Sequence, residues 1–247
     1  MKLDKKVVLV TGASKGIGAA VVRDLASQGA TVLLNYRSDD GAANEVKNSV
    51  EKAGGSVTLL KADVTNDSEV QAMFKTIQSD FGRIDVLVGN AGGLLGDDSI
   101  DDVDVFRSTF EVNLFSQVSM VKYCLPLMDE GKIVFMSSVH GGLGRGEGRV
   151  ASYSAAKAAL NSYMKNLAKE LAPSILVNAV SPGRTATPAW GVMNPEEKSE
   201  RGKGHATGRM LEPDEIASGV RFLIENDSMC GEILTIDGGM SITTLHS

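Results

Sequence analysis

The chain has 247 residues, and 43% of them are apolar, which is enough for a large buried core and excludes a disordered chain. The formal net charge of -6 disfavours nucleic acid or an anionic membrane as the main partner. The cysteines, Cys124 and Cys230, lack the spacing of a metal site, as do the three histidines, so we expect no metal. The apolar run Val7–Val10 is too short for a signal peptide, and no stretch approaches the length of a membrane span. We therefore expect a cytoplasmic protein that has no membrane partner.

Short β-branched runs alternate with longer amphipathic segments, which is typical of a repeated βα unit. In chain order, the sequence predicts a strand at Val7–Val10, a helix at Lys15–Gln28, a strand at Thr31–Asn35, a helix at Ala42–Ala53, a strand at Val57–Leu60, a helix at Asp67–Phe81, a strand at Asp85–Val88, a helix at Val105–Leu127, a strand at Lys132–Met136, a helix at Tyr153–Leu171, a strand at Ile175–Val180, a helix at Pro213–Ile224 and a strand at Ile233–Ile236. Such alternation favours parallel strands covered by helices on both faces. We expect an α/β fold, a single Rossmann-type doubly wound domain over residues 1–247 with a seven-stranded, mostly parallel sheet.

One segment breaks this alternation. Residues 185–212 are rich in glycine and charge and contain no predicted strand. A long irregular insert in a compact domain is usually either functional or disordered. We expect the 185–212 segment to form a lid over the functional site.

A glycine-rich turn, Thr11–Gly18, lies where the first predicted strand becomes the first helix. Glycines there let the backbone approach a pyrophosphate, and the helix N-terminus supplies free N–H groups. The strand before the turn and the helix after it are the context that a dinucleotide site requires. We expect cofactor contacts along this turn, from Gly12, Ser14, Lys15, Gly16, Ile17 and Gly18.

Tyr153 and Lys157 are spaced i, i+4, so on a helix their side chains share one face. An ammonium near a phenol favours the phenolate and lowers the tyrosine pKa, which suits proton transfer to a carbonyl or from an alcohol. Ser137 and Ser138 follow the fifth strand, at the edge of the sheet where ligands bind. From spacing alone, either hydroxyl could hold a substrate oxygen.

With further motifs in the same order, the whole chain resembles the short-chain dehydrogenase/reductase family. The motifs are the TGxxxGxG turn, Asp63-Val64, Asn90-Ala91-Gly92, Asn113, Ser138, the Tyr153–Lys157 YxxxK pair, Pro182-Gly183 and Asp237-Gly238-Gly239. The sequence departs from the family at Gly89, where a second asparagine is usual, and in a longer, glycine-rich loop over residues 141–149 that borders the substrate.

The resemblance implies a catalytic set of Asn113, Ser138, Tyr153 and Lys157, in which Ser138 is preferred to Ser137 and Asn113 holds a water that links to the lysine. It also implies a nicotinamide cofactor and homodimers or homotetramers. The cofactor contacts that it adds are Asp63, Val64, Asn90, Ala91, Gly92, Tyr153, Lys157, Pro182, Gly183, Thr185 and Thr187. The family's PGxxxT spacing favours Thr187 over Thr185.

The end of the second strand favours NADP(H) as the cofactor. Arg37 and Ser38 follow this strand with no carboxylate at its end, and Lys15 lies in the glycine turn, so cations face the position of a 2′-phosphate. Asp39 and Asp40 lie close by, so NAD remains the alternative cofactor.

The expected function is hydride transfer between NADP(H) and a small carbonyl or secondary alcohol. One alternative is reduction of 3-oxoacyl groups on acyl carrier protein, although residues 128–131 and 172–174 lack the basic side chains that an acidic carrier would need. Another alternative is a non-catalytic NADP-sensing protein. We expect apolar residues at the substrate end of the site: Leu94, Leu95, Val139, Trp190 and Met193.

Overall fold

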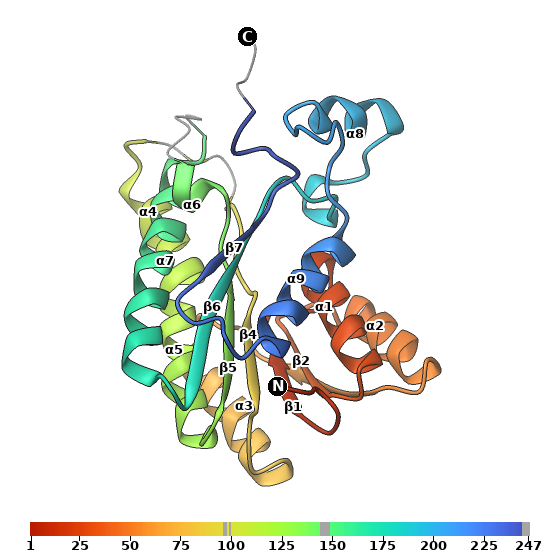
Figure 1. Cartoon of the computed structure of the whole chain (residues 1–247), viewed down its shortest axis with the longest axis vertical. Helices are drawn as coiled ribbons and strands as arrows, with labels where there is room; N and C mark the ends of the chain where they lie inside the picture. The colour runs from red at the N-terminus through yellow and green to blue at the C-terminus, as the bar shows by residue number, and fades with distance from the viewer. Residues whose placement is uncertain (96–97, 99, 144–148, 244–247) are drawn as a thin grey trace.

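In the computed structural model of the chain, which describes residues 1–95, 98, 100–143 and 149–243, all seven strands lie in one sheet (Figure 1). The strands are β1 (Val7–Val10), β2 (Thr31–Tyr36), β3 (Ser56–Lys61), β4 (Val86–Gly89), β5 (Gly131–Met136), β6 (Ile175–Pro182) and β7 (Ile233–Ile236). Their order is β3-β2-β1-β4-β5-β6-β7, and every pairing is parallel. The order reverses direction between β1 and β4, which creates the crevice where this architecture binds ligands. The predicted α/β class and parallel sheet are confirmed.

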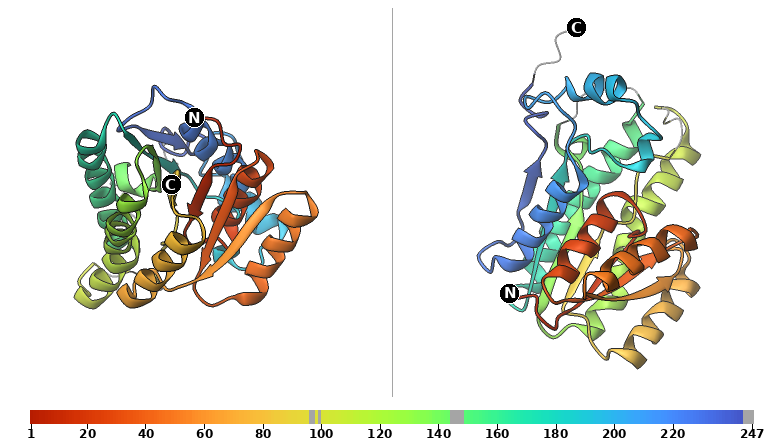
Figure 2. Two further views of the ribbon diagram at one scale, coloured as in Figure 1. Left: turned by 90° about the horizontal axis from the view of Figure 1, so that it is seen from below. Right: turned by 90° about the vertical axis from the view of Figure 1, so that its right-hand side faces the viewer.

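Helices cover both faces of the sheet, as Figure 2 shows from two further directions. The long ones are α1 (Gly16–Ser27), α2 (Asp40–Lys52), α3 (Asp67–Asp80), α4 (Val103–Phe110), α5 (Ser116–Cys124), α7 (Ala151–Leu171), α8 (Pro195–Gly202) and α9 (Pro213–Glu225). Shorter turns are the π-helical η1 (Glu111–Phe115), the 3₁₀ turns η2 (Leu125–Leu127) and η3 (Pro188–Trp190), and α6 (His140–Leu143).

The core is divided into two layers by the sheet. Val8 and Val10 of β1 face α1, α2 and α9, whereas Val7 and Leu9 face α3, α5 and α7. Side chains alternate between the faces of a strand, so a strand that is apolar throughout can be buried on both sides. Burial of this kind explains why the strands read as uninterrupted β-branched runs.

Helix ends follow local signals in the sequence. Asn66 caps α3, because its side chain accepts hydrogen bonds from the N–H groups of Ser68 and Glu69. Gly29 follows α1 with φ of +86°, a conformation that glycine adopts without a steric penalty. Asp39 caps α2, so this helix begins before the predicted Ala42.

The helix predicted over Val105–Leu127 is confirmed as one unbroken helical stretch, because α4, η1, α5 and η2 follow one another without a gap from residue 103 to residue 127. The π-helical turn η1 within it was not predicted. The wide π-helical turn contains Asn113, whose amide nitrogen bonds the carbonyl of Thr109 one turn earlier. Turns of this type occur frequently at functional sites, but the side chains around them keep helical periodicity. The sequence pattern therefore could not distinguish this turn from an ordinary helix.

The 185–212 segment is more ordered than its composition predicts. It contains α8, which opens with a reciprocal capping box between Asn194 and Glu197 and has Pro195 at its first position. The helix is polar all round, so periodicity gave no sign of it. Residues 144–148 of the loop that was expected to border the substrate lie outside the described part of the chain.

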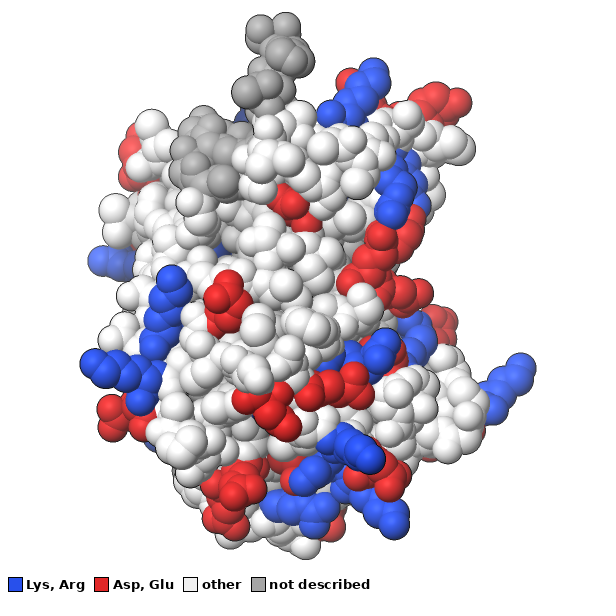
Figure 3. All heavy atoms as spheres, viewed as in Figure 1, with Lys and Arg blue, Asp and Glu red and all other residues white. Residues whose placement is uncertain are grey.

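Acidic and basic side chains are interspersed over the lower part and along both edges of the face shown in Figure 3. Within the residues that the structure describes, no helix combines the length and the apolar character needed to cross a bilayer.

Candidate functional site

A cavity of about 1520 Å³ opens where β1, β4, β5 and β6 end. Ligands of open parallel sheets bind at this edge, and the volume exceeds the roughly 300–1000 Å³ that one small ligand occupies. The space therefore suits a dinucleotide together with a substrate.

Most residues predicted for the site line this cavity. Those that do are Gly12, Lys15, Gly16, Ile17, Gly18, Arg37, Asp63, Val64, Asn90, Ala91, Gly92, Ser138, Tyr153, Lys157, Pro182, Gly183, Thr185 and Thr187. Ser14, Ser38 and Asn113 lie outside its lining.

The glycine turn packs directly against the end of β4. Gly12 has φ of +60°, and a Cβ added to it would lie 2.8 Å from the Cα of Ala91. A Cβ on Gly18 would meet the side-chain amide of Asn90 at 2.6 Å. Both positions have no room for a side chain, so the backbone of the turn itself lines the cavity.

Thr11 and Asn90 join the two strand ends. The Thr11 hydroxyl accepts hydrogen bonds from the N–H groups of Asn90 and Ala91, each at 3.0 Å. The side-chain amide of Asn90 in turn donates hydrogen bonds to the carbonyls of Thr11 and Gly12. The remaining asparagine of the family motif thus fastens the glycine turn. At Gly89 a Cβ would lie 2.3 Å from Oε1 of Gln117 and 2.7 Å from the ring of Phe135, so this position has no room for a side chain.

The end of β2 carries charges of both signs. Lys15 pairs with Asp39 at 2.5 Å, and both side chains are about half exposed. Burial raises the pKa of Asp63, but hydrogen bonds from the main chain and the hydroxyl of Thr65 outweigh this and, with a smaller effect of the Arg37 charge, hold it below its ordinary value. Lys15, Arg37 and Asp63 line the cavity, whereas Asp39 lies outside it and caps α2.

Asn35 has a role that the sequence did not reveal. Its side chain is buried, accepts a hydrogen bond from the N–H of Gly12 at 3.2 Å, and donates to the carbonyls of Leu60 and Ala62. This amide holds the glycine turn to β2 and β3. Only its position at a strand end next to a glycine turn could have pointed to it.

Two serines at the end of β5 have different partners. Ser137 donates its hydroxyl to the side chain of Asn161 at 2.6 Å. Ser138 hydrogen bonds to the Tyr153 phenol and accepts a longer bond from the N–H of His140 at 3.3 Å. The rings of His140 and Tyr153 also meet edge to face, with 6.3 Å between their centroids. Of the two hydroxyls, the one on Ser138 therefore faces the tyrosine.

Lys157 is buried one turn beyond Tyr153. Its Nζ donates to the carbonyl of Met136 at 2.8 Å and lies 5.6 Å from the centre of the Tyr153 ring. Burial lowers the lysine pKa to about 7. Burial also raises the tyrosine pKa, and the hydrogen bond with Ser138 only partly offsets this. The tyrosine pKa is therefore raised, whereas the sequence predicted that the ammonium would lower it.

Asn113 lies beneath the cavity rather than in its wall. Its amide oxygen accepts from the N–H of Gly93 and its amide nitrogen donates to the carbonyl of Gly93, both at 2.9 Å. A Cβ on Gly92 would lie 2.7 Å from this oxygen and 3.4 Å from Nζ of Lys157. Asn113 thus fixes the loop that follows β4 close to the lysine.

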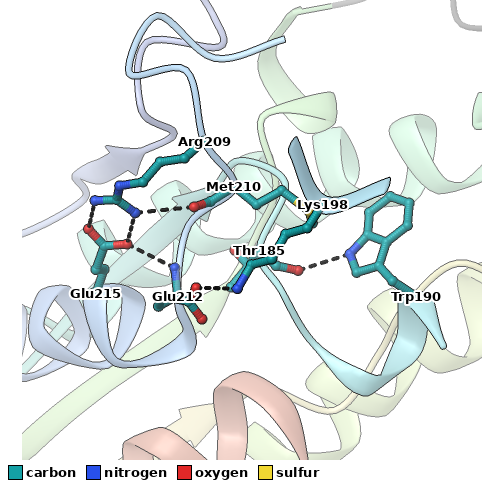
Figure 4. Close-up of polar contacts among 7 residues, drawn as sticks. All are labelled: Thr185, Trp190, Lys198, Arg209, Met210, Glu212 and Glu215. Carbon is teal, nitrogen blue, oxygen red and sulfur yellow. Dashed lines mark hydrogen bonds and ion pairs between the residues drawn. The ribbon is translucent and has the colours of Figure 1, made fainter. Parts of the chain in front are cut away.

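The 185–212 segment is fastened at its base and across its middle (Figure 4). The indole of Trp190 donates to the carbonyl of Thr185 at 2.9 Å, and Lys198 of α8 pairs with Glu212 at 2.6 Å. Arg209 holds Glu215 of α9 through two nitrogens. Thr185, Trp190 and Arg201 line the cavity, so these contacts hold the segment beside it.

The two threonines at the start of this segment also differ. The hydroxyl of Thr185 donates to the carbonyl of Gly183 at 3.1 Å. The side chain of Thr187 packs on Gly16, where an added Cβ would approach it to 3.2 Å. Thr187 therefore borders the glycine turn, whereas the Thr185 hydroxyl has an internal partner.

The residues present fit a dinucleotide. Lys15, the N-cap residue of α1, makes no side-chain cap bond, so the first N–H groups of this 12-residue helix face the cavity without a side-chain acceptor from the cap. The close approach at Gly12 lets a pyrophosphate reach them. Asp63 and Val64 line the same cavity at the end of β3.

Comparison with known proteins gives consistent matches over the whole chain. Residues 12–241 match the family model described as enoyl-(acyl carrier protein) reductase. A 3-oxoacyl-[acyl-carrier-protein] reductase of Synechocystis is 36% identical, over 96% of this chain and 98% of its own length. A solved mutant short-chain dehydrogenase/reductase of Serratia marcescens superimposes with a TM-score of 0.90 at 32% identity, over 98% of this chain and all of that one.

A further solved relative carries a bound cofactor. It is a 7α-hydroxysteroid dehydrogenase in complex with NADH and 7-oxo glycochenodeoxycholic acid, and it has a TM-score of 0.88 at 30% identity, over 96% of this chain and 95% of that one. Its fold agrees with the sheet and helices described above, and it binds a dinucleotide, which is the kind of ligand that the residues of this site fit. The chain is an oxidoreductase that belongs to the short-chain dehydrogenase/reductase family.

Proposed function

We propose that this protein transfers hydride between NADP(H) and a small carbonyl or secondary alcohol, with Tyr153 as the general acid or base. The observation that carries the proposal is the group formed by Tyr153, Ser138 and Lys157 in one cavity with the glycine turn. Two hydroxyls converge there on a position that a substrate oxygen can occupy. Positioned proton transfer of this kind contributes about 10²–10⁴-fold to a rate.

The cofactor would lie along the ends of the strands. The glycine turn from Gly12 to Gly18 would hold its pyrophosphate, and Asp63 with Val64 would contact the adenine. When bound, the nicotinamide ring supplies the hydride or accepts it. Arg37 and Lys15 support the choice of NADP(H), because both cations line the cavity and Asp39, the carboxylate that pairs with Lys15, lies outside it.

The remaining site residues would act on the proton. Ser138 orients the substrate oxygen toward Tyr153, which donates its proton to that oxygen in reduction. Lys157, with a pKa of about 7, is able to exchange a proton near neutral pH. Asn113 keeps the loop after β4 against the lysine, which supports its proposed part in proton relay.

The substrate end of the cavity supports a free, partly apolar molecule. Of the apolar residues expected there, Leu94, Leu95, Val139 and Trp190 line it, and Met193 lies outside the lining. The 185–212 segment would close over such a substrate as a lid, because Trp190 and Arg201 both face the cavity from it.

A carrier-bound acyl substrate is the second candidate, since relatives at 34–36% identity are 3-oxoacyl-[acyl-carrier-protein] reductases. Residues 128–131 and 172–174 meet at the amino ends of β5 and β6, where the N–H of Gly131 bonds the carbonyl of Ser174. That edge is opposite the cavity. Asp129 and Glu130 give it negative charge, which opposes docking of an acidic carrier.

We also propose a homodimer or homotetramer. Phe115 and Val118 are 52% and 38% exposed on one stretch of η1 and α5, where a partner subunit would bury both together. Size-exclusion chromatography with light scattering measures the state directly, and a monomer at micromolar concentration would contradict this proposal.

Oxidation of NADPH with a panel of free ketones and a 3-oxoacyl carrier substrate tests the function. We expect turnover of a free ketone in the wild type and a loss of about 10²-fold or more in Tyr153→Phe. Tyr163→Phe is the matched control, because Tyr163 is on the same helix but packs on Phe135 outside the cavity. Faster turnover of the carrier substrate would favour the second candidate. Tight NADPH binding without turnover in any variant would favour a sensor.

A further inference from the structure

Helix α7, which presents Tyr153 and Lys157, begins without a cap of its own. The N-cap position is Val150, and it makes no side-chain hydrogen bond to the helix. The first N–H groups of any helix have no partner within the helix, so a buried helix start needs an acceptor from elsewhere. Here that start forms part of the cavity wall.

Asp98 supplies the acceptor from the loop between β4 and α4. One of its carboxylate oxygens accepts from the N–H of Ser152 at 3.2 Å, and the other accepts from the N–H of Tyr153 at 3.1 Å. These are the second and third residues of α7, the positions that an N-cap side chain normally serves. Asp98 is 5% exposed, and a negative charge at a helix N-terminus is favourable.

The same helix start is tied to the loop a second time. The Ser152 hydroxyl donates to the Thr109 hydroxyl at 3.0 Å, and the carbonyl of Thr109 accepts from the Asn113 amide at 2.9 Å. Asn113 then bonds both main-chain groups of Gly93. Ser152, Thr109 and Asn113 are all buried. The contacts thus form a closed circuit from Gly93 through α4 and α7 to Asp98, which is in the same loop as Gly93.

We propose that Asp98 is a positioning residue for the reaction: its carboxylate fixes the main chain of Tyr153 to the loop that also carries Leu94 and Leu95 into the cavity. This inference rests on the proposed role of Tyr153. The Asp98 side chain then fixes the position of Tyr153 relative to Leu94 and Leu95, which line the substrate end of the cavity. A carboxylate performs this better than a serine or threonine because its two oxygens serve two N–H groups at once.

The consequence concerns the geometry of the phenol. Tyr153 is on α7 whereas Ser138 follows β5, so their hydrogen bond depends on where α7 begins relative to the sheet. Without the Asp98 carboxylate, the first turn of α7 is no longer held to the loop, and the Tyr153 phenol moves relative to Ser138. Displacement of a reacting group by about 1 Å can lower a rate about 10²-fold.

Asp98→Ala and Asp98→Asn test the proposal, with Asp102→Ala as the matched control. Asp102 caps α4 by accepting from two backbone N–H groups, so its loss removes the same kind of contact and the same charge nearby, but not from α7. We expect kcat of Asp98→Ala to fall by about 10- to 100-fold with the KM for NADPH changed less than about twofold. Asp98→Asn keeps one acceptor oxygen and is expected to be intermediate. Asp102→Ala is expected to keep kcat within about twofold of the wild type.

Thermal unfolding of each variant separates positioning from general stability. Wild-type kcat in Asp98→Ala, or an equal loss of kcat in Asp102→Ala, would overturn the proposal. If Asp98→Ala does not fold, kcat of Asp98→Asn decides: a wild-type value overturns the inference, and a reduced value at an unchanged KM for NADPH supports it. Wild-type activity in Tyr153→Phe would instead show that the proposed function is wrong, and the inference would fall with it.

A double-mutant cycle tests the circuit itself. Thr109→Val removes the hydroxyl that binds Ser152, and it acts on the same helix start as Asp98→Ala. Groups that share one structural link show non-additive effects. We expect the loss of kcat in the double variant to be smaller than the product of the two single losses. Multiplicative losses would show that the two contacts act separately and would overturn the circuit.

Discussion

Nζ of Lys157 donates a hydrogen bond to the carbonyl of Met136 at 2.8 Å, across from α7 to the last residue of β5. This contact fixes the lysine to the strand that also leads into Ser138. The lysine is only 3% exposed, and its ammonium is deprived of water on most sides. Burial is the cause of its pKa of about 7.

The first prediction concerns stability against pH. The pKa of folded Lys157, about 7, lies below the ordinary lysine value of 10.5, so between these pH values the unfolded chain binds a proton that the folded chain lacks. Stability therefore rises with pH through this window, by up to about 1.4 kcal/mol per pH unit from this group. Below pH 7 both states are protonated and the contribution is constant.

Urea unfolding at pH 7 and pH 9 measures this slope. We expect Lys157→Met to remove it, so that the free energy of unfolding changes less between the two pH values than in the wild type. Lys165→Met, an exposed lysine on the same helix, should leave the slope as it is. Identical slopes in the wild type and Lys157→Met would show that the buried lysine keeps an ordinary pKa.

Local patterns predicted most of the fold, because strands buried on both faces and capped helices are specified by neighbouring residues. The Tyr153–Lys157 pair and the glycine turn were found for the same reason, since each lies within one turn or helix. The cap that Asp98 provides joins residues 54 and 55 positions apart, and no periodicity marks it. The predicted lowering of the Tyr153 pKa was also wrong. The sequence shows the nearby lysine, but it does not show the burial that raises this pKa.

The choice of cofactor gives the second prediction. Arg37→Asp should lower the ratio of kcat/KM for NADPH to that for NADH by about ten- to a hundredfold, because a hydrogen bond to a charged group is worth about 1.5–3 kcal/mol. Arg23→Asp makes the same change of charge on the exposed side of α1 and is the control. The measurement is steady-state kinetics with both cofactors. A wild type that prefers NADH would contradict the assignment directly.

The close approach at Gly12 gives the third prediction. Gly12→Ala places a Cβ 2.8 Å from the Cα of Ala91, so the turn must move away from β4. We expect the Kd for NADPH to rise about tenfold or more, since the pyrophosphate site depends on this approach. Gly54→Ala is the control for backbone strain, because its φ of +84° is also positive but nothing lies within 4 Å of the added Cβ. Both variants should lose stability, by about 1–2 kcal/mol from strain, but only Gly12→Ala should bind NADPH weakly.

The last prediction concerns the lid. Trp190 is the one tryptophan of the chain, so its fluorescence reports on the 185–212 segment alone. It lines the cavity with the guanidinium of Arg201 4.6 Å above its ring, and 38% of the residue is exposed. We expect its emission to change and saturate as NADP⁺ fills the cavity, and to change further with a substrate alcohol, because closure removes water from the indole. Arg201→Ala should alter the emission of the free protein, while Lys203→Ala, at the exposed C-terminal end of α8, should not. An emission that stays constant through saturation with both ligands would show that the segment does not close over the site.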